Sequence, residues 1–480
     1  MLFNSYVFIL SFLPVTLVVF FLLVRLNLQK LAKIWLTVAS LFFYGYWNFA
    51  YLPLLLISTG FNYYLGGAIA NQKPRSKSAK LLLGFGISCN LSLIAYYKYA
   101  GFLIKTTNGL GLDFVIPSII LPLGISFYTF TQIAYLVDAF RGEIKRCDLL
   151  TYTLFISFYP QLIAGPLLLH QELMPQLQGS KNFRLSYENL AQGLVWFCFG
   201  LAKKLLIADR VSVFVAPVFD NAAQVSFLEA WLGALSYTLQ LYFDFSGYSD
   251  MAIGLALMLN IHLPLNFDSP YKATSIVEFW RRWHMTLSRF LRDYLYVPLG
   301  GNRLGEARRF VNLMITMLLG GLWHGAGWTY VIWGGLHGMF LIVNHGWRKL
   351  GWTMPKVLGW LITFVCVVVS WVFFRASSVQ DATEMLLAMF GAKQILIPMS
   401  HQAFFQSLPL PGIKFVESLP LWGDPKLLAV LLLCVLFLPN TQQIMKLFKP
   451  NLWWAIGASV IATLSLLSMN KVSEFLYFQF

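Results

Sequence analysis

The sequence predicts an all-α protein that crosses a membrane many times, on three observations. Of the 480 residues, 58% are hydrophobic and 11% are charged, whereas soluble domains carry about 25% charged residues. Apolar runs long enough to span a bilayer follow one another along the chain. The loops between them are short and rich in lysine and arginine. This composition excludes a soluble enzyme.

The candidate spans are distributed over the whole chain. The first lacks a basic leader and a cleavage site, so it is predicted to be a helix rather than a signal peptide. Several later runs are interrupted, and we expect about eleven to thirteen spans. The apolar runs are 6–24, 34–50, 51–70, 81–97, 116–138, 149–169, 189–208, 226–243, 247–262, 310–323, 328–345, 357–374, 426–439 and 452–469.

The net charge of +15 reflects the loops. The loop 71–80 holds four basic residues and no acid, and Arg348, Lys349 and Lys356 follow a later run. By the positive-inside rule these loops are cytoplasmic, which places the N-terminus and the mixed segment 376–424 outside. The basic residues therefore predict contact with acidic membrane lipids and no nucleic-acid partner.

Two of the apolar runs contain residues that break helices. Pro117, Pro122 and Gly124 interrupt one, and the stretch FYPQLIAGP at 158–166 interrupts another. Irregular backbone at membrane depth is tolerated only where it is buried in protein or lines a water-filled cavity. These interruptions predict an internal cavity.

The most informative stretch is GGLWHGAGWTYVIWGGLHG at 320–338, which holds two histidines, three tryptophans and seven glycines inside an apolar region. A polar side chain at membrane depth is costly unless it faces a cavity or a partner. His324 is therefore a candidate general base, because imidazole exchanges protons near neutral pH. The alternative is a core histidine, with Trp323 and Trp328 in an interfacial belt. The glycine pairs favour a site, since they permit a bend and close helix packing.

The segment 266–309 is the most basic part of the chain. Its apolar residues recur at helical spacing, which predicts an amphipathic helix at the membrane interface or re-entering the membrane. We expect this helix to start after Ser275, with Glu278 completing a capping box.

On such a helix, Arg281, His284 and Ser288 share one face. An arginine beside a histidine suits a phosphate or a thioester carrier, because guanidinium matches phosphate geometry. The alternative is a helix that binds lipid headgroups and carries no chemistry.

Three acids lie in apolar surroundings: Asp244, Asp250 and Asp268. They either orient a histidine or, as we favour, form structural ion pairs with arginines of the basic segment. None has the spacing of a metal site. The remaining histidines, His170, His262, His345 and His401, are isolated, and His337 is too far from His324 to be its neighbour on one helix.

The five cysteines show neither metal-ligand nor CxxC spacing, so we expect packing roles for them. They are Cys89, Cys147, Cys198, Cys366 and Cys434.

Longer blocks connect these residues. They are MLFNSYVFILSFLP (1–14), FISFYPQLIAGP (155–166), FDFSGYSDMAIG (243–254), SPYKATSIVEFWRRWHMTLSRFLRDYLYVPLGGNR (269–303), the block 320–338, VFFRA (372–376) and FLYFQF (475–480). Together they resemble the membrane-bound O-acyltransferase (MBOAT) superfamily from end to end. The alginate O-acetyltransferase-like branch of bacteria is the nearest match, and WRRWH with PLGGNR separates it from teichoic-acid D-alanylating members.

The resemblance implies an MBOAT fold, in which membrane helices and re-entrant or amphipathic helices surround a central funnel. It implies one membrane domain over residues 1–480. Within it, 266–309 is the substrate-site segment, 310–345 is the hairpin with the catalytic histidine, and 376–424 is extracytoplasmic.

The resemblance also implies acyl transfer, with His324 as the essential histidine and His284 as the second recurrent one. Residues expected to bind substrate are Arg281, Trp280, Trp323, Ser288 and Asn302. We expect neither a bound cofactor nor a metal, and we expect acetyl-CoA as the acetyl donor.

The implied setting is the inner membrane of a bacterium. The implied reaction is O-acetylation of an alginate-like exopolysaccharide, made directly or through a periplasmic acetyltransferase partner. Peptidoglycan, cellulose or another envelope glycan is the alternative acceptor. Two other classes compete: an acyl-group transporter, which would more often show paired repeats, and a structural scaffold, which would tolerate loss of His324.

Overall fold

The computed structural model describes residues 1–144, 148–179, 182–402, 413–417, 424–469 and 475–476. Within them, regular structure is almost entirely helical, as predicted, with two short parallel strands, β1 (Ile395–Pro398) and β2 (Ile413–Val416). The four described cysteines are half-buried thiols. Cys147 and most of the block FLYFQF lie outside the described residues.

Five helices of the described chain are long and apolar enough to cross a membrane. They are Phe8–Arg25, Phe49–Ala70, Lys77–Asn108, Tyr187–Phe219 and Lys356–Arg375. Two shorter apolar helices, Pro425–Phe437 and Leu452–Leu467, coincide with the last two predicted spans. The protein is thus a multi-pass helical membrane protein. The larger number of spans stays a prediction, since the other runs form helices that are shorter or more polar.

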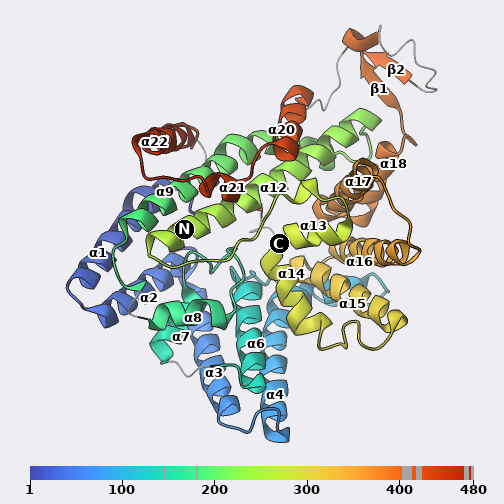
Figure 1. The fold of residues 1–480 in the computed structure, drawn as a ribbon. Helices are drawn as coiled ribbons and strands as arrows, with labels where there is room; N and C mark the ends of the chain where they lie inside the picture. The colour runs from blue at the N-terminus through green and yellow to red at the C-terminus, as the bar shows by residue number, and fades with distance from the viewer. Residues whose placement is uncertain (145–147, 180–181, 403–412, 418–423, 470–474, 477–480) are drawn as a thin grey trace. The chain divides into compact units, whose positions relative to one another are not determined.

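The chain divides into two compact units, each discontinuous in sequence. Unit 1 comprises Met1–Ala202, Gly247–Asn266 and Met445–Gln479, and unit 2 comprises Lys203–Ser246 and Phe267–Ile444. Figure 1 shows their helices coloured along the chain.

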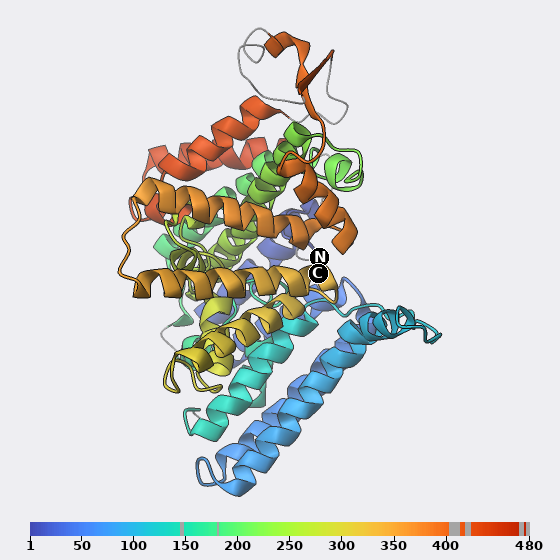
Figure 2. The same cartoon turned by 90° about the vertical axis from the view of Figure 1, so that its right-hand side faces the viewer.

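Unit 1 holds the N-terminal helices, the second half of α12 (Phe227–Met258) and α22. In Figures 1 and 2, α3 and α4 run beside α6. Its core contains a cluster of aromatic rings in which Tyr159 meets Phe8, Phe12 and Phe43. The helices are η1 (Phe8–Phe12), α1 (Leu13–Arg25), α2 (Gln29–Gly45), η2 (Phe49–Tyr51), α3 (Leu52–Ala70), α4 (Lys77–Ile94), η3 (Ala95–Tyr99), α5 (Ala100–Asn108), α6 (Ile125–Arg141), α7 (Leu149–Ser157), α8 (His170–Gln178), α9 (Tyr187–Ala202) and α22 (Leu452–Leu467).

Both predicted interruptions are present in unit 1. Helix α6 begins only at Ile125, after Gly124, whose φ of +69° is a left-handed conformation that glycine adopts readily. Helix α7 ends at Ser157, and residues 158–168 continue as buried, non-helical backbone. This agrees with the rule that irregular backbone in such a protein is enclosed by protein.

The two spans predicted at 226–243 and 247–262 are wrong, because α12 is one continuous helix of 32 residues. Gly247 does not end it. A Cβ atom built on Gly200 of α9 would lie 2.5 Å from the Gly247 carbonyl oxygen, and one on Gly193 would lie 2.6 Å from that of Gly254. The glycines therefore mark close approach of two helices rather than a helix end.

Unit 2 holds the first half of α12 and the histidine-bearing segments. Helix α15 packs along α16, and α16 packs along α17 (Figure 2). The helices are η5 (Lys203–Ala208), α10 (Asp209–Ser212), α11 (Ala216–Phe219), η6 (Pro270–Lys272), α13 (Ile276–Arg282), α14 (Met285–Leu291), η7 (Arg292–Tyr296), α15 (Glu306–His324), α16 (Trp328–Lys349), α17 (Lys356–Arg375), α18 (Val379–Met389), η8 (Met399–His401), α20 (Pro425–Phe437) and α21 (Thr441–Met445).

Candidate active site

The two histidines singled out in the sequence lie together inside unit 2. His324 is the last residue of α15 and is 6% exposed, and His284, between α13 and α14, is fully buried. The centroids of their rings are 6.2 Å apart. The two residues are forty positions apart in the sequence, yet the fold brings their rings side by side, so this histidine pair is the centre of the candidate site.

Glycines set the position of His324. A Cβ atom on Gly321 would lie 2.2 Å from the Tyr330 carbonyl oxygen, and one on Gly334 would lie 2.3 Å from that of Met317. Only glycine at these positions lets α15 and α16 approach so closely. Gly325, extended with φ −156°, ends α15 directly after the histidine. The predicted bend is therefore a helix end that leaves His324 at the C-terminus of α15.

A backbone break sets the position of His284. Helix α13 ends at Arg282, and His284 adopts a left-handed conformation with φ +43° and ψ 52° before α14 begins. For a residue with a Cβ this costs of order 1–3 kcal/mol and is found where the surrounding structure enforces it, often at functional sites.

This break overturns the prediction that Arg281, His284 and Ser288 share one face of a continuous helix. Arg281 belongs to α13, Ser288 belongs to α14, and His284 lies in the break between the two helices. The three side chains therefore do not lie on one face of one helix. The predicted start is confirmed, with Ser275 as the cap that accepts from the Glu278 backbone N–H. The capping box is only half formed, because the Glu278 carboxylate accepts from the N–H of Thr274 instead.

Aromatic rings wall both histidines. His324 meets Trp323 at 4.8 Å, Trp333 at 5.1 Å and Phe374 at 5.2 Å between ring centroids. His284 meets Phe245 at 4.8 Å and Trp323 at 6.1 Å. Trp323 is 4% exposed and contacts both histidines, so it lies in the site, whereas Trp328 is 53% exposed.

Complete burial lowers the pKa of His284 to about 3, since a low-dielectric surrounding disfavours the charged ring. The imidazole is therefore neutral at physiological pH and offers one N–H donor and one acceptor nitrogen. It is suited to hydrogen bonding rather than to carrying a positive charge.

His337, which the sequence left without a role, is part of the same cluster. Trp280 Nε1 donates to His337 Nδ1 at 3.2 Å. The proton of the neutral ring is then on Nε2, which donates to Ser370 Oγ at 2.9 Å, and that hydroxyl donates to the Val367 carbonyl oxygen at 2.8 Å. Trp333 lies 4.8 Å from His337 and so connects it to His324.

A signal for His337 existed in the sequence. The blocks GGLWHG and GGLHG each place a histidine within two residues after a Gly-Gly-Leu, and α15 and α16, which carry these blocks, pack closely against each other. Trp371 also belongs to the cluster, with its ring centroid 6.2 Å from that of His337. Like Trp333, Phe374 and Phe245, it carried no comparable signal, because the role of these rings depends on packing between distant segments.

The other predicted binding residues lie in several places. Trp280 faces His337, and the Ser288 hydroxyl donates to the Trp283 carbonyl oxygen at 3.4 Å. Asn302 is exposed on the turn before α15. Arg281 is exposed and lines a basic cavity together with residues of α15 and α16. Of the five residues predicted to bind substrate, Trp280 and Trp323 contact the histidine cluster through their rings.

Of the three acids, one forms the favoured ion pair with an arginine of the basic segment. The Asp268 carboxylate lies 3.8 Å from Arg282 Nη1. Asp244 pairs with a lysine rather than an arginine, because Lys204 Nζ lies 2.7 Å from Asp244 Oδ1 and 3.0 Å from Asp209 Oδ1. Asp250 is 7% exposed. The described residues contain no group of three His, Cys, Asp or Glu side chains that could hold a metal ion.

These features define the class of the protein: a multi-pass helical membrane protein whose buried histidines are held between glycine-packed helices. Comparison with known proteins agrees. Residues 46–379 match the family described as MBOAT, membrane-bound O-acyltransferase family. The chain belongs to this family and is an acyltransferase, which confirms the resemblance found in the sequence.

Individual relatives share much of the chain. A peptidoglycan O-acetyltransferase of Helicobacter pylori is 41% identical over 100% of this chain and 98% of that protein. A probable alginate O-acetylase AlgI of Pseudomonas aeruginosa is 43% identical over 82% of this chain and 75% of that protein. A teichoic acid D-alanyltransferase of Streptococcus thermophilus is 29% identical over 52% of this chain and 68% of that protein.

Proposed function

We propose that the protein is an O-acetyltransferase of a cell-envelope glycan in the inner membrane of a bacterium, with His324 as general base. The observation that carries the proposal is the buried imidazole of His324 at the end of α15, with the neutral His284 ring 6.2 Å away. Relatives named as acetyltransferases of peptidoglycan and alginate support the acyl group and the class of acceptor.

The reaction is transfer of an acetyl group from a thioester to a hydroxyl. A ring nitrogen of His324 takes the proton of the acceptor hydroxyl as its oxygen bonds to the acetyl carbonyl carbon. The carbon–sulfur bond then breaks, and His324 returns the proton to the leaving thiolate. The partial negative charge at the C-terminus of α15 favours the intermediate imidazolium by about 0.3–1 kcal/mol.

His284 acts as a neutral hydrogen-bonding group in this scheme. Its buried ring positions the thioester or the tetrahedral intermediate through one donor and one acceptor nitrogen. The surrounding tryptophan and phenylalanine rings limit access of water, which protects the thioester from hydrolysis.

Acetyl-CoA is the proposed donor, and it approaches from the cytoplasmic side, where the basic loops are expected. The acceptor is either the glycan or a serine of a periplasmic acetyltransferase partner that relays the acetyl group. Segment 376–424, which contains α18, β1 and β2, is the proposed docking surface for that partner.

Two acceptors are favoured, each by a different observation. An alginate-like exopolysaccharide is favoured by the blocks 269–303 and 320–338, which resemble the alginate branch. Peptidoglycan is favoured by the relative of that name, whose match extends over 100% of this chain, whereas the alginate O-acetylase of Pseudomonas aeruginosa matches over 82%.

The test is release of ester-bound acetate by mild base from separated peptidoglycan and exopolysaccharide fractions of cells carrying the chain. His324→Ala should reduce the acetate by roughly 10²–10⁴-fold, the usual contribution of a general base. His262→Ala, which removes an exposed histidine, serves as the matched control and should leave acetate unchanged. The fraction that loses acetate identifies the acceptor. Full acetylation by a properly inserted His324→Ala protein would exclude the proposal.

A further inference from the structure

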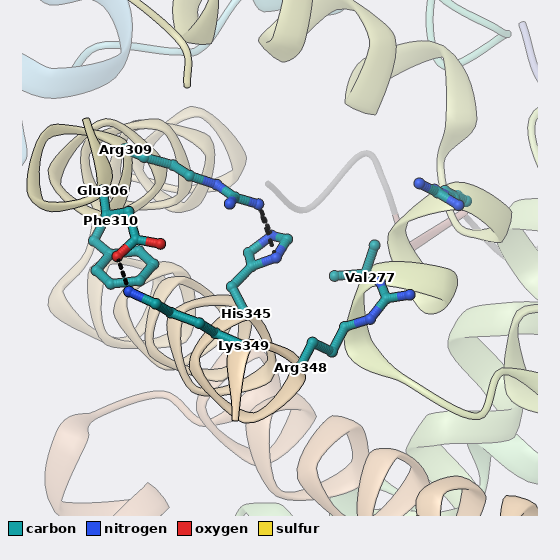
Figure 3. Close-up of a pocket in the computed structure, with 8 residues that line it drawn as sticks. Val277, Glu306, Arg309, Phe310, His345, Arg348 and Lys349 are labelled. Atoms are coloured by element: carbon teal, nitrogen blue, oxygen red, sulfur yellow. Dashed lines mark hydrogen bonds and ion pairs between the residues drawn. The ribbon is translucent and has the colours of Figure 1, made fainter. Parts of the chain in front are cut away.

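A cavity of about 440 Å³ lies in unit 2 between α13, the start of α15 and the end of α16. Figure 3 shows side chains from α15 and α16 meeting across it. Its lining residues are Val277, Arg281, Glu306, Arg309, Phe310, His345, Arg348 and Lys349. The described residues that line the cavity include four cationic side chains and one carboxylate, so the cavity is strongly basic.

The single carboxylate does not neutralise the cavity. Glu306 accepts a hydrogen bond from Lys349 Nζ and is thereby matched to one of the four cations. The guanidinium groups of Arg281, Arg309 and Arg348 remain around the same space. Like charges brought together repel, and a bound anion would relieve that repulsion.

Arg309 is held in place by a neutral histidine. Its Nη2 lies 2.8 Å from His345 Nδ1 and 3.1 Å from His345 Nε2 (Figure 3). A guanidinium only donates, so the ring nitrogen facing it must be an unprotonated acceptor. The hydrogen bond orients the guanidinium and leaves its other N–H groups available to a ligand.

The helix geometry adds to the attraction for an anion. Glu306, Arg309 and Phe310 lie in the first turns of α15, a helix of 19 residues. The N-terminus of a helix carries a partial positive charge and backbone N–H groups without intrahelical partners. The N-terminus of α15 and the arginine cluster therefore both favour an anionic ligand.

We propose that this cavity binds a phosphate-bearing ligand, held by the guanidinium groups of Arg281, Arg309 and Arg348. Arginine matches phosphate oxygens through paired N–H groups, which distinguishes phosphate from a simple halide. Two sources supply this chemistry: the nucleotide phosphates of the thioester donor and the headgroup of an anionic phospholipid.

The helices relate the cavity to the histidine pair. Arg309 and His324 belong to the same helix, and fifteen residues at 1.5 Å each place them roughly 22 Å apart along it. Helix α13 lines the cavity with Arg281 and directs Trp280 to His337. A ligand whose phosphates lie in the cavity and whose reacting group lies at His324 must join the two by a long arm. A coenzyme A thioester has this form. This source of the ligand rests on the proposed function.

The first test compares binding of coenzyme A and of pantetheine, which lacks the nucleotide phosphates, to the detergent-solubilised full chain by calorimetry. Arg309→Gln and Arg348→Gln should each weaken coenzyme A binding by roughly 10-fold or more, as expected for loss of a charged hydrogen bond, and leave pantetheine binding unchanged. Lys356→Gln, an exposed cation outside the cavity, is the matched control and should alter neither.

The second test distinguishes the two sources. Phosphatidylglycerol that copurifies with wild type and is lost from both arginine variants, with coenzyme A binding unchanged, assigns the site to a lipid headgroup. Variants that alter neither coenzyme A binding nor bound lipid overturn the proposal. The binding measurement does not depend on turnover. If the wild type binds coenzyme A more tightly than the variants do, the site is supported even when no acetyl transfer occurs. Absence of acetyl transfer would then reject only the proposed function.

Discussion

His324 and His284 are both buried, yet their backbone settings suit them to different tasks. His324 ends a 19-residue helix, where a positive charge on the ring is favoured. His284 is in a left-handed conformation within an apolar surrounding that disfavours the charged ring. The first is suited to accept a proton during reaction, and the second is suited to remain neutral.

The lowered pKa of His284 predicts acid sensitivity. An unfolded histidine titrates near 6.5, so the unfolded chain binds more protons than the folded chain between about pH 6.5 and 3. The stability contribution is complete above pH 6.5 and is lost as the pH falls. At pH 5 the loss is about 2 kcal/mol.

The measurement is the apparent melting temperature in detergent at pH 7.5 and pH 5.0. His284→Gln, which cannot be protonated in this range, should show a smaller drop between the two pH values than wild type. His262→Gln, at an exposed site, should show the wild-type drop. An equal drop in His284→Gln and wild type would contradict the assignment.

His337 is predicted to position the site rather than to react. His337→Ala removes the acceptor for the Trp280 N–H and the donor to Ser370, and each buried polar group left without a partner costs about 1–3 kcal/mol. Because Trp333 contacts both His337 and His324, acetylation should fall as well.

Rescue by a conservative variant separates positioning from chemistry. His337→Gln keeps one donor and one acceptor, so it should recover a larger part of the melting temperature and of the base-released acetate than His337→Ala. If both variants lost acetylation equally while retaining wild-type stability, His337 would have a direct chemical role instead.

At the level of secondary structure, the pairing of α15 with α16 decides where the histidines lie. The helices touch through Gly321 and Gly334, where any side chain would meet backbone atoms of the other helix. The hydrophobic effect provides no driving force between helices in lipid. Small residues at the interface instead allow close van der Waals packing, which holds the two helices together.

Adjacent glycines offer a matched test of this interface. Gly334→Ala places a methyl group 2.3 Å from the Met317 carbonyl oxygen, whereas Gly335→Ala meets only the Leu318 side chain at 3.5 Å. Gly334→Ala should lower the melting temperature and the acetylated fraction, because α16 must move away from α15. Gly335→Ala should be close to neutral in both measurements, and equal effects of the two changes would argue against close packing as the reason for the glycines.

For the molecule as a whole, the distribution of basic residues predicts how the chain is oriented in the membrane. The loop 71–80 should face the cytoplasm and the segment 376–424 the outside. Arg75 and Gln380 are exposed positions in these two regions.

Labelling with a membrane-impermeant maleimide tests this orientation, in a variant whose five native cysteines are replaced by serine. Gln380→Cys should react in intact spheroplasts, and Arg75→Cys should react only after the membrane is opened. Labelling of Arg75→Cys in intact spheroplasts would contradict a cytoplasmic position of the loop 71–80.

Much of this protein could be predicted from local patterns. Apolar runs, basic loops and helix-breaking prolines depend on composition and near neighbours, so they predicted a multi-pass helical protein, the interruption before Ile125 and the helix start at Ser275. The candidate histidines were also visible, because a polar residue among glycines in an apolar run conflicts with a purely structural role.

What local patterns could not provide is any relation between distant segments. The left-handed backbone of His284 separated Arg281 from the histidine it was expected to accompany. The close approach of Gly247 to Gly200 of α9 depends on a helix elsewhere in the chain. His337 joins the cluster only because α16 packs against α15. Helical periodicity describes one segment at a time, whereas the distances between side chains that form a site are determined by how the segments pack in three dimensions.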